Sequence, residues 1–298
     1  MPIHFRGILA LLVVTLVWGT TFPAMKDLTP HFPAVWIIVV RFAMAGLLLS
    51  PFLWRAKLRD CALGAVLGAI LFICYMMQLK GLALTSSNRN AFVTGLNVLM
   101  VPVLGIAAGK LPERRIVLAI VLAILGLFAL CWDGGAWGWG DTLALIGAFF
   151  FGLYIKLMET MTRRASNLMV LTVTQIIVVA LCAALWLVAW ELPHHPLDWQ
   201  QMPDLMRAHF GNFLYLGLFA TAGIISLQTW AQRHSSANEA AVMYSFEPAC
   251  AAIAAYFLLG ETMTWRGLLG AGLLICGMIV SQWMPANGTG RVAPAPET

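Results

Sequence analysis

Ten long apolar runs separated by short polar connections limit this chain to a helical bundle that spans a membrane. A helix needs about 20 mostly apolar residues to cross the hydrocarbon core of a bilayer. We predict ten spans, over residues 7–25, 34–54, 60–84, 90–109, 115–133, 141–160, 168–190, 212–232, 238–259 and 264–284. Only 10% of the 298 residues are charged, whereas a soluble domain carries roughly 25%. The predicted fold class is all-α and integral to the membrane.

The distribution of Lys and Arg predicts how the spans are oriented. The most basic loops, at 55–59, 110–115 and 163–164, alternate along the chain with loops that are poor in Lys and Arg. Basic residues accumulate in cytoplasmic loops, so we expect both termini in the cytoplasm. The net charge of +5 follows from this pattern, and we expect no nucleic-acid partner. The six cysteines form no CxxC pair, which predicts neither a disulfide nor a metal site.

Weak internal repetition divides the ten spans into two sets of five. Three pairs of segments align in the same order: 18–26 with 151–159, 86–87 with 235–236, and 109–115 with 260–266. Because five is odd, the two sets must run in opposite directions through the membrane. Such inverted repeats are common in secondary transporters, which bind substrate between the repeats. We predict an N-terminal half over 1–133, a C-terminal half over 134–284 and a disordered cytoplasmic tail over 285–298.

The first span contains the stretch WGTTFP, at 18–23, which combines two poor helix residues. Pro23 lacks a backbone N–H and its ring clashes with the carbonyl four residues earlier, so we expect a loosened helix at Gly19. Loosened backbone at membrane depth is tolerated only against protein or a wet cavity. We therefore expect this stretch, Trp18 included, to face a cavity. The alternative is that Gly19 and Thr20 allow tight helix packing.

Polar and aromatic side chains recur at helical spacing within several spans and are candidates for a binding site. Besides Trp18, they are Tyr75, Gln78, Thr94, Asn97, Tyr154, Gln228, Trp230 and Tyr244. Rings accept apolar groups and ammonium alike, and amides bind carboxylate and ammonium, so this set suits a zwitterion with an apolar side chain. For each aromatic residue, plain packing or a place in an interfacial belt is the alternative.

Two ionisable residues, Arg41 and Glu247, lie deep within predicted spans, where charges are costly. One interpretation is that they pair, directly or through water, and hold the two halves together. We favour a structural role for Glu247, because the neighbouring Pro248 leaves a backbone carbonyl unpaired. The alternative is that Glu247 titrates and couples transport to protons.

Several of these segments together resemble the EamA family of the drug/metabolite transporter superfamily. The resemblance rests on WGTTFPAMK at 18–26, on Arg41-Phe42 and, most specifically, on SFEPACAAIAAYFLLGE at 245–261. Within that family the length and span count are similar to those of bacterial YddG-type exporters of aromatic and other neutral amino acids. The resemblance implies a bacterial inner-membrane protein of two inverted halves. It also implies a central cavity lined by the first, third, fourth, sixth, eighth and ninth spans.

The predicted function is secondary transport: export of neutral or aromatic amino acids, or of similar small metabolites, by alternating access. The predicted partners are a small-molecule substrate and the lipid bilayer; we expect a monomer that needs no cofactor. One alternative is a carrier of the same superfamily for drugs, organic cations, sugars or nucleotides. Phosphorylated substrates would call for several Lys or Arg in the cavity. The other alternative, an intramembrane lipid-modifying enzyme, would need paired carboxylates for a metal or a nucleophile with its base.

Overall fold

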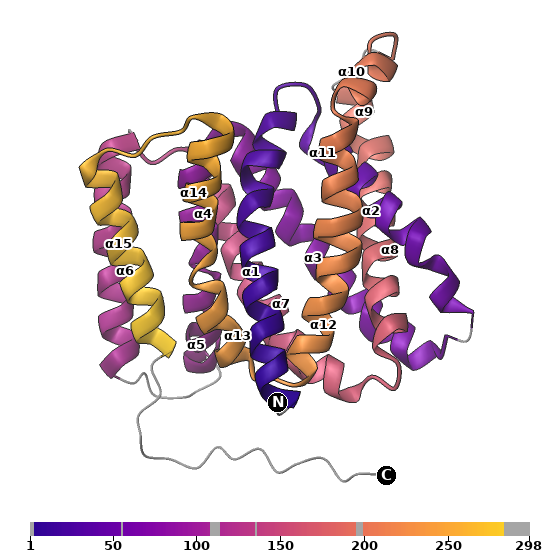
Figure 1. Ribbon diagram of the computed structural model, residues 1–298, viewed down its shortest axis with the longest axis horizontal. Coiled ribbons are helices and arrows are strands. Elements are labelled where there is room, and N and C mark those ends of the chain that lie inside the picture. The colour runs from indigo at the N-terminus through magenta and orange to yellow at the C-terminus, as the bar shows by residue number, and fades with distance from the viewer. Residues whose placement is uncertain (1–2, 55, 108–113, 135, 195–198, 283–298) are drawn as a thin grey trace.

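The structure, a computed structural model, describes residues 3–54, 56–107, 114–134, 136–194 and 199–282. All regular elements in these ranges are helices (Figure 1). Seven of the described helical segments are long and apolar enough to cross a membrane: Ile3–Leu28, Ala34–Leu53, Leu58–Leu84, Trp139–Arg164, Leu168–His194, Phe210–Arg233 and Glu239–Leu259. The all-helical class predicted from the sequence is therefore confirmed.

The helices follow the predicted apolar runs closely. The first part of the chain forms α1 (Ile3–Leu28), α2 (Ala34–Leu49), the short 3-10 helix η1 (Ser50–Leu53), α3 (Leu58–Leu84), α4 (Ser87–Gly95), α5 (Asn97–Ala107) and α6 (Arg114–Gly134). The second part forms α7 (Trp139–Arg164), α8 (Leu168–Trp186), the π-helix η2 (Leu187–Glu191), α9 (Leu192–His194), α10 (Met202–Ala208), α11 (Phe210–Leu214), the π-helix η3 (Tyr215–Gly223), α12 (Ile224–Arg233), α13 (Ala237–Tyr244), α14 (Glu247–Leu259) and α15 (Trp265–Gln282).

Four of the ten predicted spans are shorter or divided in the described residues. The predicted span 90–109 is divided between α4 and α5, and the predicted span 238–259 between α13 and α14. The fifth and tenth correspond to the apolar stretches Val117–Ala129 in α6 and Trp265–Val280 in α15. The predicted tail over 285–298 lies outside the described residues. The count of ten therefore stays a prediction.

The helices form one bundle in which sequence-distant elements pack together. In Figure 1, α6 and α15 form a pair at one end of the bundle, and α2 packs on α8 at the other end. Between these ends, α1 packs against α12 and α14, and α3 packs against α7 and α8. The beginning of α1 and the end of α15 lie on the same side of the bundle (Figure 1).

Helices α4 and α5 form one rod, and α13 and α14 form another; each rod is interrupted near its middle. The two breaks lie at the centre of the bundle. One break is at Leu96, between α4 and α5, and the other is at 245–246, between α13 and α14. Pro248 in the first turn of α14 explains the second break, because its ring would clash with the carbonyl of Tyr244 in a continuous helix.

The first helix is not interrupted at Gly19, where the sequence predicts a loosened helix. Helix α1 continues without interruption from Ile3 to Leu28, with Pro23 in its interior. Two hydroxyl groups brace the turn before the proline: Thr20 Oγ1 donates to the Val17 carbonyl and Thr21 Oγ1 to the Trp18 carbonyl, each at 2.7 Å. Membrane helices tolerate proline where Ser or Thr side chains and neighbouring helices stabilise the freed backbone.

Two carboxylates tie distant helix ends together. Asp60, in the first turn of α3, accepts hydrogen bonds from the backbone N–H and hydroxyl of Ser166 and from the N–H of Asn167, at 2.6–3.1 Å, just before α8 begins. Beyond the other end of α3, Glu261 accepts from the N–H groups of Ser87 and Asn88 at the start of α4, at 2.9 and 3.0 Å. Both use the affinity of helix N-termini for negative charge.

Candidate functional site

A narrow cavity of about 20 Å³ lies at the centre of the bundle, where the two helix breaks meet α1, α3, α7 and α12. Its lining residues are Trp18, Thr21, Tyr75, Gln78, Thr94, Asn97, Phe151, Tyr154, Ile155, Gln228, Tyr244 and Glu247. A void of this size holds about one water molecule. The cavity must therefore widen before it can admit any metabolite.

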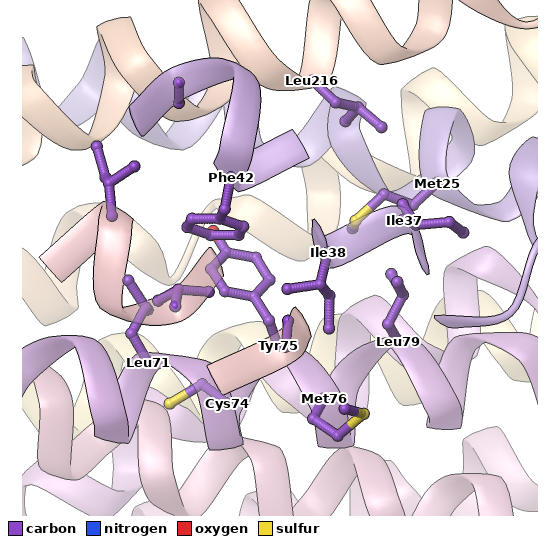
Figure 2. Close-up of a cluster of buried hydrophobic side chains, with 14 of the residues drawn as sticks. Met25, Ile37, Ile38, Phe42, Leu71, Cys74, Tyr75, Met76, Leu79 and Leu216 are labelled. Atoms are coloured by element: carbon purple, nitrogen blue, oxygen red, sulfur yellow. The ribbon is translucent and has the colours of Figure 1, made fainter. Parts of the chain in front are cut away.

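Aromatic rings make up much of the cavity wall. The rings of Trp18 and Tyr244 are 5.7 Å apart, and those of Tyr75 and Phe151 meet edge to face at the same distance. Behind Tyr75, Phe42 packs edge to face at 5.0 Å, within the apolar cluster that Figure 2 shows. The wall thus presents ring faces and edges at fixed positions, which suits apolar groups and organic cations.

Several polar atoms of the wall have no hydrogen-bond partner among the described residues. They are Trp18 Nε1, Asn97 Oδ1, both amide atoms of Gln228 and the Tyr244 hydroxyl. Gln228 is only 1% exposed. Buried polar groups in folded proteins are nearly always hydrogen-bonded, so unpaired groups gathered on one cavity indicate a place where water or a ligand binds.

Glu247, the first residue of α14, brings a carboxylate to the cavity wall. Among the described residues this carboxylate forms neither a hydrogen bond nor an ion pair. The direct pair with Arg41 that the sequence suggested is absent among the described residues, where Arg41 is bonded to other groups. Its Nε donates to Thr221 Oγ1 at 2.5 Å and its guanidinium lies 4.8 Å from the centre of the Tyr75 ring. Sequence spacing places residues at a depth but does not choose between two such partners.

Of the nine side chains predicted to bind substrate, eight line this one cavity: Trp18, Tyr75, Gln78, Thr94, Asn97, Tyr154, Gln228 and Tyr244. Trp230 does not, and its ring packs against His234 at 4.9 Å instead. Residues two apart on an α-helix point in different directions, so Gln228 and Trp230 cannot share the cavity face.

Three lining residues were not named as binding candidates from the sequence: Thr21, which lies in the stretch 18–23 expected to face a cavity, Phe151 and Ile155. Thr21 follows Trp18 by three residues and so lies on the same helix face. Phe151 opens the segment 151–159, which aligns with 18–26. Both positions were therefore detectable in the sequence, whereas no signal distinguished Ile155 from other apolar residues.

Glycines bring the walls of the cavity close together. A Cβ atom on Gly19 would lie 2.5 Å from the Cβ of Cys250 in α14, and one on Gly152 would lie 2.5 Å from the Cβ of Met100 in α5. Pro248 packs in the same way on Gly95, where an added Cβ would be 2.5 Å from the proline Cγ. Gly19 and Pro248 therefore hold α1, α4 and α14 in contact beside the two helix breaks.

A second, open cavity of about 850 Å³ lies beyond the end of α3 and is strongly charged. We call this cavity the vestibule; its ionisable residues are Lys26, Arg89, Asp141 and Glu261. Arg89 Nε donates to Asp141 Oδ1 at 2.6 Å, and Lys26 Nζ donates to the carbonyls of Leu82 and Thr85 at 2.9 and 2.6 Å. Each of these charged groups is therefore bonded either to another of them or to backbone groups at a helix end. In the described part of the chain, no group of three His, Cys, Asp or Glu could hold a metal ion.

Comparison with known proteins identifies the family. The model of the EamA-like transporter family matches residues 5–132 and again 138–282. A protein of Archaeoglobus fulgidus described as an uncharacterized transporter is 28% identical over 273 residues, covering 91% of this chain and 84% of its own. Another uncharacterized transporter of that organism is 24% identical, covering 92% and 98%.

A solved crystal structure superposes with a TM-score of 0.63 at 15% identity, covering 93% of this chain and 96% of the other. At that identity the likeness shows a shared fold. The family match extends over nearly the whole chain, and both the family and the relatives are described as transporters, not enzymes. The chain is therefore a membrane-embedded member of the EamA-like transporter family.

Proposed function

We propose that this protein is a secondary transporter that exports aromatic and other neutral amino acids by alternating access. The observation that carries the proposal is the central cavity, in which aromatic rings, unpaired amides and one carboxylate converge at two helix breaks. Transporters commonly bind substrate at the midplane, between helices that are discontinuous there. The proposal includes ten spans, with both termini in the cytoplasm of a bacterial inner membrane, and a monomer as the working unit.

The composition of the cavity wall supports a neutral or zwitterionic substrate with an apolar side chain. The rings of Trp18, Tyr75 and Tyr244 offer apolar surface, and Gln78 and Gln228 offer amide groups that bind either end of a zwitterion. The wall contains no Lys or Arg among the described residues. A phosphorylated sugar or nucleotide would therefore leave its charge uncompensated at membrane depth.

Residue spacing around the cavity supports the two inverted halves. Ten of the twelve lining residues form five pairs with two constant separations. The pairs 133 residues apart are Trp18 with Phe151 and Thr21 with Tyr154, and the pairs 150 apart are Gln78 with Gln228, Thr94 with Tyr244 and Asn97 with Glu247. This is the pattern expected if the cavity lies on a two-fold axis between related halves.

Two pairs of helix crossings support the same arrangement. The contact of Gly19 with Cys250 corresponds, at the same two separations, to that of Gly152 with Met100, and both give an added Cβ at 2.5 Å. The contact of Gly126 with Leu274, between α6 and α15, corresponds to that of Gly277 with Ala123 at a separation of 151. The step from a separation of 133 to one of 150 fits an insertion of 17 residues in the second half, in the long connection before α11, and the step to 151 adds one further residue.

Alternating access is proposed because the cavity has room for no more than about one water molecule, while the vestibule is large and open at one end of the bundle. Substrate would enter when one half tilts against the other. Helix α4 offers a polar route between the two spaces, since Asn88 lines the vestibule and Thr94 lines the cavity.

Counterflow in proteoliposomes tests the function. Vesicles containing the purified chain and unlabelled L-phenylalanine should accumulate labelled L-phenylalanine, and protein-free vesicles should not. Tyr244→Ala should abolish the accumulation, whereas Phe257→Ala, at an exposed position on α14, should leave it unchanged. Counterflow of glucose 6-phosphate in place of amino acids would overturn the proposal.

A further inference from the structure

The two helix breaks bring matched positions to the cavity, but the two positions differ in charge. Asn97 is the first residue of α5 and Glu247 the first of α14, and both line the cavity. They are 150 residues apart, the separation shared by two other lining pairs. A neutral amide thus stands on one side of the cavity where a carboxylate stands on the other.

This difference in charge gives the two sides of the cavity opposite electrostatic preferences, although most other lining residues stand at matched positions. A helix N-terminus carries a partial positive charge and attracts anions. At α5 that attraction is available to a ligand, since Asn97, the first residue of this helix, carries no charge and its amide N–H2 group can donate to a carboxylate. At α14 the negative charge of the Glu247 carboxylate outweighs the partial positive charge of the helix N-terminus. The Asn97 side therefore favours a carboxylate, and the Glu247 side a cation.

No cation of the protein neutralises Glu247 among the described residues. The nearby guanidinium of Arg41 is bonded to Thr221 Oγ1 and to the Ala220 carbonyl, at 2.5 and 3.3 Å, and covers the Tyr75 ring. A carboxyl group buried in a membrane protein is either protonated or paired with a cation, and an ammonium group of the ligand can supply that cation. The rings of Trp18 and Tyr244 add a surface that attracts a cation.

We propose that Glu247 binds the ammonium group of the substrate and so fixes its orientation, with the substrate carboxylate directed toward Asn97 at the start of α5. This inference rests on the proposed function and adds to it a head-group preference. The cavity accepts zwitterions and protonated amines and rejects carboxylates that have no amino group.

Three probes that share one ring test the preference: L-phenylalanine, phenethylamine and 3-phenylpropionate. We expect isothermal titration calorimetry of the purified full chain at neutral pH to show binding of the first two, and at least tenfold weaker binding of 3-phenylpropionate. Glu247→Gln should weaken binding of both amines at least tenfold without weakening that of 3-phenylpropionate. Glu159→Gln, which removes a carboxylate from an ion pair with Lys156, should match the wild type.

Two further variants separate the role of the charge from that of folding. Glu247→Asp keeps the charge and should keep the preference for amines. Exchanging the two matched residues, by Asn97→Glu together with Glu247→Asn, should restore the preference for amines over 3-phenylpropionate that Glu247→Gln loses. A folded Glu247→Gln protein that still discriminates tenfold among the probes would overturn the inference.

The outcomes also separate this inference from the proposed function. Phenethylamine binding that requires Glu247, with no binding or transport of L-phenylalanine, would support the ammonium site and overturn the proposal of amino-acid export. If L-phenylalanine is transported and binds the wild type and Glu247→Gln equally well, the carrier stands and the ammonium site fails. If the wild type binds none of the three probes, both are overturned.

Discussion

Gly19 lies so close to Cys250 that a Cβ atom on the glycine would be 2.5 Å from the Cβ of the cysteine, and 2.9 Å from the backbone N of Ala251. Helices α1 and α14 can therefore approach this closely only because residue 19 has no Cβ atom. Because Trp18 and Glu247 stand on these same two helices and line the cavity, the crossing also sets the width of the cavity.

We expect Gly19→Ala to force α1 and α14 apart, since the nearest atoms are a Cβ and backbone. Overpacking of this kind costs about 1–3 kcal/mol, and thermal melting in detergent should show a lower midpoint together with reduced transport. Gly272→Ala is the matched control, because an added Cβ at Gly272 in α15 meets nothing within 4 Å. Equal melting midpoints for the two variants would contradict the tight crossing.

We predict opposite effects on stability when Gln228 and Gln175 are each replaced by leucine. Gln228→Leu removes an amide that is buried without a partner in the described structure, so thermal stability should rise by about 1 kcal/mol while transport is lost. Gln175→Leu removes the acceptor of the Tyr154 hydroxyl, which lies at 2.9 Å, and should destabilise the protein by about 1–3 kcal/mol. A loss of stability in both variants would argue that Gln228 serves the fold.

Arg41 is predicted to be irreplaceable by lysine. It is 1% exposed, and its planar head bonds Thr221 while it covers the Tyr75 ring. A lysine has no planar fork with which to do both, so Arg41→Lys should cost about 1.5–3 kcal/mol of stability. Arg207→Lys, at a side chain 82% exposed, should have no measurable effect. Thermal melting of the two variants in parallel distinguishes them.

Asp60 should matter through its charge and its three hydrogen bonds at the start of α8. Asp60→Asn preserves the shape but leaves one oxygen to accept where two did, so Ser166 or Asn167 loses its bond. We expect a loss of about 1–3 kcal/mol and faster proteolysis near residues 163–167. Asp204→Asn, whose carboxylate is 83% exposed, serves as the control and should be neutral. Indistinguishable proteolysis of the two variants would show that Asp60 does not hold this junction.

Much of the fold follows from the apolar runs alone, because bilayer thickness fixes both the length and the composition of a spanning helix. The helix breaks were harder to predict. Pro23 and Pro248 are the same residue type in two apolar runs, yet α1 is continuous and the α13–α14 rod is broken. The difference depends on neighbours: Thr20 and Thr21 brace α1, whereas Pro248 packs on Gly95 of another helix.

The site residues could be predicted where their spacing along one helix determines which way they point. They could not be predicted where a contact with a distant helix determines it. Tyr75 and Gln78, three residues apart, share a face and reach the cavity together, whereas Trp230, two residues from Gln228, points elsewhere. Spacing could not reveal that Arg41 is bonded to Thr221, because these residues are brought together by α2 and η3, far apart in the chain.

The smallness of the central void bears on leakage. A space of about 20 Å³ admits a water molecule but no hydrated sodium ion or sugar. A protein that keeps this shape therefore offers such solutes no passage through the central cavity.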